Sequence, residues 1–166
     1  MPAPHPFEVT MQRDIEGRLK ALGVVLPVAP KPAANYVPFV RTGNLLFLAG
    51  ALPFVDNRLE TTGLLGRDLD VARGQALARI CAINMLAQVK AATGDLERLS
   101  RVVRLSAFVA CVPGFVEQPA VVNGASDFLV DVLGESGRHA RSAMGVSVLP
   151  LNAPLEIEAV FELKDD

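Results

Sequence analysis

The clearest alternation of apolar and polar positions covers residues 155–163, which read Leu-Glu-Ile-Glu-Ala-Val-Phe-Glu-Leu. A period of two places the odd positions on one face of a β-strand and the even positions on the other. The even face carries three carboxylates, at Glu156, Glu158 and Glu162. We therefore predict a strand with one apolar face towards the core and one acidic face.

A second strand is predicted just before it. Residues 142–148 are small or β-branched, as in a buried strand, and Pro150 and Pro154 interrupt the pattern. The two strands are expected to form a hairpin that begins at Arg141. A guanidinium beside apolar strand residues suits a planar anion such as a carboxylate, because its fork donates two parallel hydrogen bonds. A surface arginine beside a solvated acidic face fits the same pattern.

Three further extended segments precede this hairpin. Residues 34–40 are followed by a turn at 42–44 and by the apolar run 45–50, whose two faces we expect to be covered. Residues 102–112 alternate again, and Val103 is placed with Leu105 on one face.

Three helices are predicted between these strands. The first runs from a cap at Thr10 to Leu22, and Gly23 ends it. The second covers about 70–92, with an apolar stripe of Ala72, Ala76, Ile80, Ile83, Ala87 and Ala91. The third covers about 117–133, with Pro119 in its first turn and Gly134 at its end.

The predicted order is helix, β, β, helix, β, helix, β, β. It indicates an α+β fold with one mixed sheet and two long helices on one face, plus the extra N-terminal helix. We divide the chain into residues 1–30, a proline-rich tail with a short amphipathic helix, and one domain over 31–166. The opposite sheet face has little in this chain to cover it, which favours an oligomer.

Composition narrows the functional classes. The chain has 166 residues, is 51% hydrophobic and 20% charged, and carries a net charge of −2. With one tyrosine, no tryptophan and no basic block, nucleic-acid binding has little support. The two cysteines and two histidines are isolated, so we expect no metal site and two reduced thiols. Neither a signal peptide nor a membrane-spanning run is recognised, so we expect a cytoplasmic protein.

At this point an ordered set of short segments resembles the RidA (YjgF-like) family of reactive intermediate deaminases. The match runs from about Pro32 to Leu163. Its segments are 35–38, 43–53, Gln75, Asn84, 94–96, 102–105, Phe115, 122–123, Phe128, 140–142, 145–146, 149–150 and 155–159. Each segment is weak by itself, and their common order is the specific signal.

The resemblance implies a chorismate-mutase-like fold, a homotrimer, and ligand clefts between subunits. It implies that Arg141 grips a substrate carboxylate and that Glu156 positions a water. Tyr36, the backbone at Gly50 and Asn123 are then expected to help line the cleft. The implied reaction is hydrolysis of a 2-imino or enamine acid to a 2-keto acid and ammonia. Neither a metal nor an organic cofactor is implied.

The predicted hairpin provides a geometric test of that implication. If Glu156 pairs near Val148, Arg141 lies seven residues farther along, or about 23 Å. The two side chains then serve one small ligand only if a second subunit supplies one of them. Three departures from the family pattern bear on rate and substrate range. Ala143 stands where a cysteine or hydroxyl residue is frequent, and His139 where proline is common. Gly50 is followed by Ala51-Leu52 and not by a polar pair, which indicates a more apolar pocket.

Other functions stay open on the sequence. A non-catalytic protein that binds a small carboxylate metabolite would use the same Arg141. Ribonuclease activity fits poorly with the net charge of −2 and the scarcity of stacking aromatics. A purely structural role is the remaining alternative. The substrate side chain and the role of the N-terminal helix are not specified by the sequence.

Overall fold

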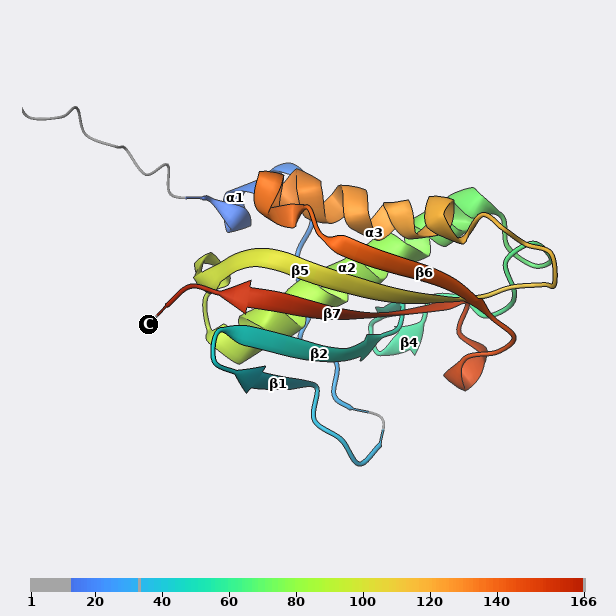
Figure 1. Ribbon diagram of the computed structural model, residues 1–166, viewed down its shortest axis with the longest axis horizontal. Coiled ribbons are helices and arrows are strands. Elements are labelled where there is room, and N and C mark those ends of the chain that lie inside the picture. Colours follow the sequence, from blue (N-terminus) through green and yellow to red (C-terminus); the bar gives the residue numbers. More distant parts are fainter. Residues whose placement is uncertain (1–12, 33, 166) are drawn as a thin grey trace, which may run out of the picture.

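The computed structural model describes residues 13–32 and 34–165 (Figure 1). These residues form three α-helices and seven strands, with short 3-10 helices at Leu96–Arg98 (η1), Gly134–Gly137 (η2) and Pro150–Asn152 (η3). The helices are α1 (Ile15–Ala21), α2 (Val71–Thr93) and α3 (Gln118–Leu133). The strands are β1 (Phe39–Thr42), β2 (Leu45–Ala51), β3 (Phe54–Val55), β4 (Arg58–Leu59), β5 (Leu99–Ala110), β6 (Ala140–Val146) and β7 (Leu155–Leu163).

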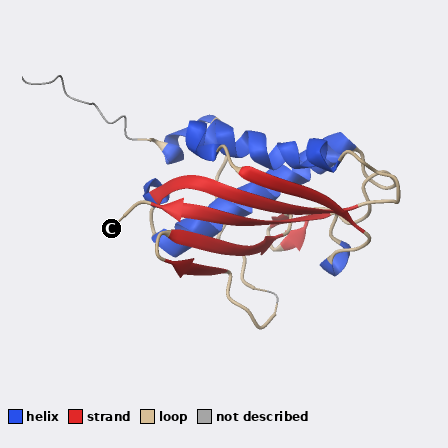
Figure 2. Cartoon of the chain, viewed as in Figure 1, coloured by secondary structure: helices blue, strands red, loops and turns tan. Residues whose placement is uncertain are grey.

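Five strands form one mixed sheet in the order β1-β2-β7-β5-β6, and β3 with β4 form a separate small hairpin. Neighbours in the large sheet are antiparallel except β5 and β6, which are parallel and joined through α3. Figure 2 shows the long helices together on one side of this sheet. The predicted α+β class, with its mixed sheet, two long helices and additional N-terminal helix, is therefore confirmed.

The predicted C-terminal hairpin is wrong. β7 does not pair with β6 but lies between β2 and β5, antiparallel to both. All five odd positions of β7 are buried, which suits a strand in the middle of the sheet. Alternation along one strand reports which face is buried and not which strand lies beside it, so adjacency in sequence gave the wrong partner.

The core lies between the sheet and the long helices, and α2 contributes a different face from the predicted one. Its bulky buried residues are Leu77, Met85, Leu86 and Val89. Of the predicted alanine and isoleucine stripe only Ala87 is buried, while Ala72, Ala76 and Ala91 are exposed. The helix buries the face with the larger side chains, because these remove more apolar surface from water than alanine does.

Helix and strand ends follow local chemistry. Asp70 caps α2 by accepting from the Arg73 N–H, and Gly94 ends it in the left-handed conformation. The predicted cap Thr10 lies outside the described residues, and α1 begins at Ile15. Its cap is Asp14, whose carboxylate accepts from the Gly17 N–H.

The face of the sheet opposite the helices carries exposed apolar side chains. Val40, Phe47 and Met144 are 54%, 43% and 46% exposed. The expected cover on both faces of 45–50 is therefore found only on the helix side, where Leu46 and Leu48 are buried. A bulge at Val103 also moves that residue out of the core, to 37% exposed, whereas alternation had placed it with Leu105.

No helix among the described residues is long and apolar enough to cross a lipid bilayer.

Candidate functional site

The side chain of Arg141, in β6, is fixed by three acceptors from α3. Nη1 donates to Asn123 Oδ1 at 2.9 Å and to Ser126 Oγ at 3.0 Å, and Nη2 donates to the Pro119 carbonyl at 3.1 Å. Arg141 pairs with the buried Leu105 in β5, so both side chains lie on the helix side of the sheet. The β5-α3-β6 crossover thus places the guanidinium against the first half of α3.

These contacts leave part of the guanidinium available. A guanidinium has five N–H groups, and the three contacts occupy both on Nη1 and one on Nη2. The Nε–H and one Nη2–H of Arg141 remain. Among the described residues, none of the ion pairs involves Arg141. The side chain is therefore an oriented cation whose charge is not neutralised by a neighbouring carboxylate, as a carboxylate-binding group requires.

His139 is linked to Arg141 through the hydroxyl group of Ser126. Since a carbonyl only accepts, the 2.6 Å contact from His139 Nδ1 to the Gly137 oxygen places the ring proton on Nδ1. Nε2 then accepts from the Ser126 hydroxyl at 3.0 Å, and the same hydroxyl oxygen accepts from Arg141. Burial lowers the pKa of His139, and the Arg141 charge lowers it further, whereas the Gly137 contact opposes the change. The neutral ring therefore completes a chain of hydrogen bonds that ends on the guanidinium.

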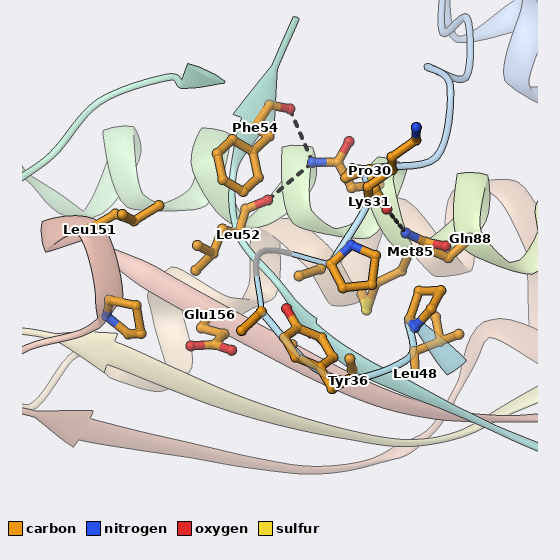
Figure 3. A pocket seen from close by; sticks show the side chains of 18 residues that line it. Pro30, Lys31, Tyr36, Leu48, Leu52, Phe54, Met85, Gln88, Leu151 and Glu156 are labelled. Atoms are coloured by element: carbon orange, nitrogen blue, oxygen red, sulfur yellow. Dashed lines mark hydrogen bonds between the residues drawn. The ribbon is translucent and has the colours of Figure 1, made fainter. Parts of the chain in front are cut away.

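The other predicted site residues lie around a separate cavity of about 380 Å³ (Figure 3). Tyr36, Gly50 and Glu156 all line it, and Figure 3 labels the side chains of Tyr36 and Glu156 among the lining residues. Its remaining wall is largely apolar and comes from four parts of the chain: the segment before β1, β2 and the residues after it, α2, and η3. The apolar wall includes Pro30, Leu48, Leu52, Phe54, Met85 and Leu151.

Glu156 is half-buried beside the backbone of Gly50. A Cβ atom built on Gly50 would lie 1.8 Å from Glu156 Oε1, so any larger residue here would displace the carboxylate from its observed position. A register shift in the β2–β7 pairing between Leu48 and Ala51 shapes the strand at the same point. Burial raises the pKa of Glu156, and the nearby charge of Glu158 adds to the rise. A carboxyl group in this state is suited to accept and return a proton.

Two amides of α2 hold the cavity wall in place. Asn84, which is 3% exposed, donates from Nδ2 to the carbonyls of Leu52 at 3.1 Å and Phe54 at 3.0 Å. Gln88 donates from Nε2 to the Pro30 carbonyl at 2.6 Å. Figure 3 marks these contacts with dashed lines. The sequence pattern singled out Asn84 only within the family resemblance, and its role as a support for the wall was missed.

The two clusters do not meet within one chain. Through β5, Arg141 is in register with Leu105 and Glu156 with Phe108. A separation of three residues along the strands and two strands across amounts to about 14 Å between backbones. The two residues also face opposite sides of the sheet. The distance of 23 Å expected from a hairpin was wrong. The observed register nevertheless keeps the two clusters apart within one chain. One cluster contains Arg141 and Asn123, and the other contains Tyr36, Gly50 and Glu156.

The described residues contain no cluster of side chains that could bind a metal ion. Within residues 13–32 and 34–165, no group of three or more histidine, cysteine, aspartate or glutamate side chains is placed to hold an ion. Cys81 is buried, and Cys111 is partly buried with its sulfur 3.7 Å from Gln118 Nε2.

Comparison with known proteins places the chain among related sequences. The family model described as "YjgF/chorismate mutase-like, putative endoribonuclease" matches residues 16–163. Protein TCP17 of Trypanosoma cruzi is 47% identical over 91% of this chain and 95% of its own length. A 2-iminobutanoate/2-iminopropanoate deaminase of Dermatophagoides farinae is 29% identical over 83% of this chain and 93% of its own.

Solved structures agree with this placement. Protein Atu1372 of Agrobacterium tumefaciens, whose function is described as unknown, is 56% identical with a TM-score of 0.85 over 90% of this chain and 92% of its own. A protein of Shewanella oneidensis described as a putative endoribonuclease is 35% identical with a TM-score of 0.87, over 90% of this chain and 99% of its own.

Proposed function

Because this chain belongs to the YjgF/RidA family, we propose that it hydrolyses reactive 2-imino and enamine acids derived from amino acids, in a cleft that two copies of the chain build together. The observation that carries the proposal is the oriented and unneutralised guanidinium of Arg141. One related protein is named as a deaminase of 2-iminobutanoate and 2-iminopropanoate. A 2-imino acid presents the planar carboxylate that such a guanidinium binds.

The cleft combines one cluster from each of two subunits in this proposal. Arg141 and Asn123 of one copy hold the substrate carboxylate, while Glu156, Tyr36 and Gly50 of the next surround the imine carbon. The support is the separation of about 14 Å and the opposite sheet faces within one chain. The exposed apolar side chains on the open sheet face supply a surface for association.

The chemistry needs only positioning and one proton carrier. Glu156 accepts a proton from water as the oxygen bonds to the imine carbon, and it returns that proton to the nitrogen of the resulting carbinolamine. As ammonia leaves, Glu156 takes the remaining proton from the hydroxyl group, so that the carbonyl forms, and passes it to the ammonia. The protonated imine and water become a 2-keto acid and ammonium, so atoms and charge balance. The carboxylate-bearing imine carbon is already electrophilic, and binding at Arg141 fixes it for attack.

An assay with freshly generated 2-iminopropanoate tests the proposal. Keto-acid release is followed through a coupled lactate dehydrogenase and corrected for spontaneous hydrolysis. Arg141→Ala is expected to lower kcat/KM by about 100-fold or more, because the carboxylate loses its bidentate partner. Arg73→Ala is the matched control. Arg73 lies in α2 and forms an ion pair with Glu60, and neither residue belongs to the proposed cleft.

Two results would count against the deaminase. Normal turnover by Arg141→Ala would remove the role of that residue. Saturable binding of a 2-keto acid with no turnover by the unaltered protein would favour a non-catalytic carboxylate-binding protein. The endoribonuclease activity named for the family has weaker support, because the net charge is −2 and the chain has one tyrosine and no tryptophan.

A further inference from the structure

The cavity beside Glu156 is larger than the smallest 2-imino acids require. It measures about 380 Å³, within the range of about 300–1,000 Å³ that accommodates sizeable small-molecule ligands. The imino acid derived from alanine has only a methyl side chain. We propose that the preferred substrates carry a large aliphatic or aromatic side chain, which enters this cavity, an inference that rests on the proposed function.

The wall chemistry favours an apolar side chain. Leu52, Phe54, Met85 and Leu151 contribute to the lining. Both N–H groups of the Asn84 amide are already donated to the carbonyls of Leu52 and Phe54. A polar substrate group that needs a donor therefore finds that amide nitrogen occupied.

The charges around the cavity disfavour an acidic side chain. Glu156 presents a carboxylate at the cavity, where a second carboxylate would be repelled. Lys31 also lines the cavity, but it is exposed, and Figure 3 shows its ammonium pointing away from Glu156. Substrates derived from aspartate or glutamate should therefore be poor.

The wall is also held in shape before any ligand arrives. Asn84 fixes the residues after β2, and Gln88 fixes Pro30 in the segment that precedes β1. Leu151 adopts a left-handed backbone conformation, with φ of 59°. Such a conformation is costly for a leucine and is found where surrounding structure enforces it, often at ligand sites. A preformed apolar cavity gains binding free energy without first having to order its walls.

A substrate series measures the preference. Imino acids are generated in place from alanine, leucine, phenylalanine and glutamate by an L-amino-acid oxidase, and kcat/KM is measured for each. Burying one methylene is worth about fourfold in affinity, so leucine-derived substrate should exceed alanine-derived substrate by about tenfold or more. Phenylalanine-derived substrate should do likewise, and glutamate-derived substrate should be the poorest of the larger three.

A variant locates the preference in the cavity. Leu52→Trp fills part of the space and should reduce the leucine-to-alanine ratio of kcat/KM about tenfold. Leu22→Trp is the matched control, because Leu22 is a partly exposed leucine at the end of α1 and does not line the cavity. Its ratio should equal that of the unaltered protein. The substrate series decides the question even if Leu52→Trp fails to fold.

Binding of the 2-keto acid products separates this inference from the proposed function. Calorimetry compares pyruvate with 4-methyl-2-oxopentanoate and phenylpyruvate. Tighter binding of the larger acids without any turnover would overturn the deaminase and support the apolar cavity. Turnover that is equal or faster for the alanine-derived substrate would overturn the cavity inference alone. Absence of both turnover and binding would overturn both.

Discussion

Glu156 and Arg141 differ in what surrounds them, and the difference assigns their chemistry. Arg141 is supplied with three acceptors and no carboxylate ion-pair partner among the described residues, so it keeps a full positive charge in a fixed position. Glu156 is half-buried against Gly50, and burial raises its pKa. The first group is arranged to hold an anion, and the second to exchange a proton.

We predict that Glu156→Gln stabilises the protein near neutral pH while reducing turnover about 100-fold or more. The raised pKa means that the folded state holds a proton more tightly than the unfolded state, so stability falls as pH rises through the interval between the two values. An amide does not ionise and avoids that loss. Urea unfolding at pH 7 and pH 4 measures the difference in the free energy of unfolding between the variant and the unaltered protein.

The stabilisation by Glu156→Gln should be present at pH 7 and diminish towards pH 4, where the glutamate is mostly protonated in both states. A variant that is less stable than the original protein at pH 7 would contradict the prediction. Glu162→Gln, farther along the same strand, is the control for removing one negative charge.

The second prediction at this scale concerns His139 and Ser126, which act on Arg141 as positioning residues. His139→Ala and Ser126→Ala should each raise KM about three- to tenfold with a smaller effect on kcat, because the guanidinium loses its fixed orientation. Since the two belong to one hydrogen-bonded chain, the double variant should cost little more than either single variant.

The pH profile of KM distinguishes positioning from a general structural role. Protonation of His139 reverses its bond with Ser126 and places a second cation beside Arg141, while the Glu135–Arg138 pair carries no net charge nearby. KM should therefore change as pH falls below the lowered pKa of His139. His139→Ala should flatten that change, and additive effects in the double variant would contradict the shared chain.

At the scale of elements, α3 carries the acceptors for Arg141, and its position depends on a close approach to α2. A Cβ atom on Gly124 would lie 2.0 Å from the Gln75 carbonyl oxygen. Gln75 also donates to the Ala120 carbonyl of α3 at 2.9 Å. The glycine therefore sets the distance between the two helices, and through it the position of Asn123 next to it.

We predict that Gly124→Ala lowers the free energy of unfolding by about 1–3 kcal/mol, because backbone atoms must move to admit the methyl group. The melting temperature should fall by several degrees, and KM should rise as α3 shifts away from Arg141. Asp127→Ala on the exposed side of α3 is the control and should change stability by no more than about 0.5 kcal/mol. Unchanged stability in Gly124→Ala would show that the helices separate without cost.

At the scale of the whole molecule, the open face of the sheet connects assembly with the site. Val40, Phe47 and Met144 are exposed there on β1, β2 and β6. Arg141 and Glu156 lie on two separated parts of one chain, so the proposed cleft requires a neighbouring copy. The family resemblance implies a trimer, which is our expectation for the assembly.

We predict a solution mass of about 53 kDa by light scattering, three times the 17.7 kDa chain. Phe47→Asp should shift the mass towards one chain and abolish turnover, because a charge buried between subunits is costly. Val25→Asp adds the same negative charge at an exposed residue outside the sheet and should leave the solution mass unaltered. A monomeric original protein with full activity would contradict the shared cleft.

The sequence by itself determined the elements and their faces wherever local chemistry decides. The alternation of 155–163 predicted the buried side of β7, and the helix predicted at about 70–92 is α2, Val71–Thr93. The ordered set of motifs indicated the family, and so the fold. These features depend on neighbours in the chain, which is why a single sequence contains them.

Only the tertiary structure decided which strands pair and which side chains meet. β7 lies beside β5 and not β6, and the bulge at Val103 reverses the face expected for that residue. His139 contacts Ser126, and Asn84 binds the carbonyls of Leu52 and Phe54. These pairs are too far apart in the sequence for helix or strand periodicity to predict them. Pairing and packing are set by the burial of the whole chain at once, and periodicity along one segment carries no information about its partner.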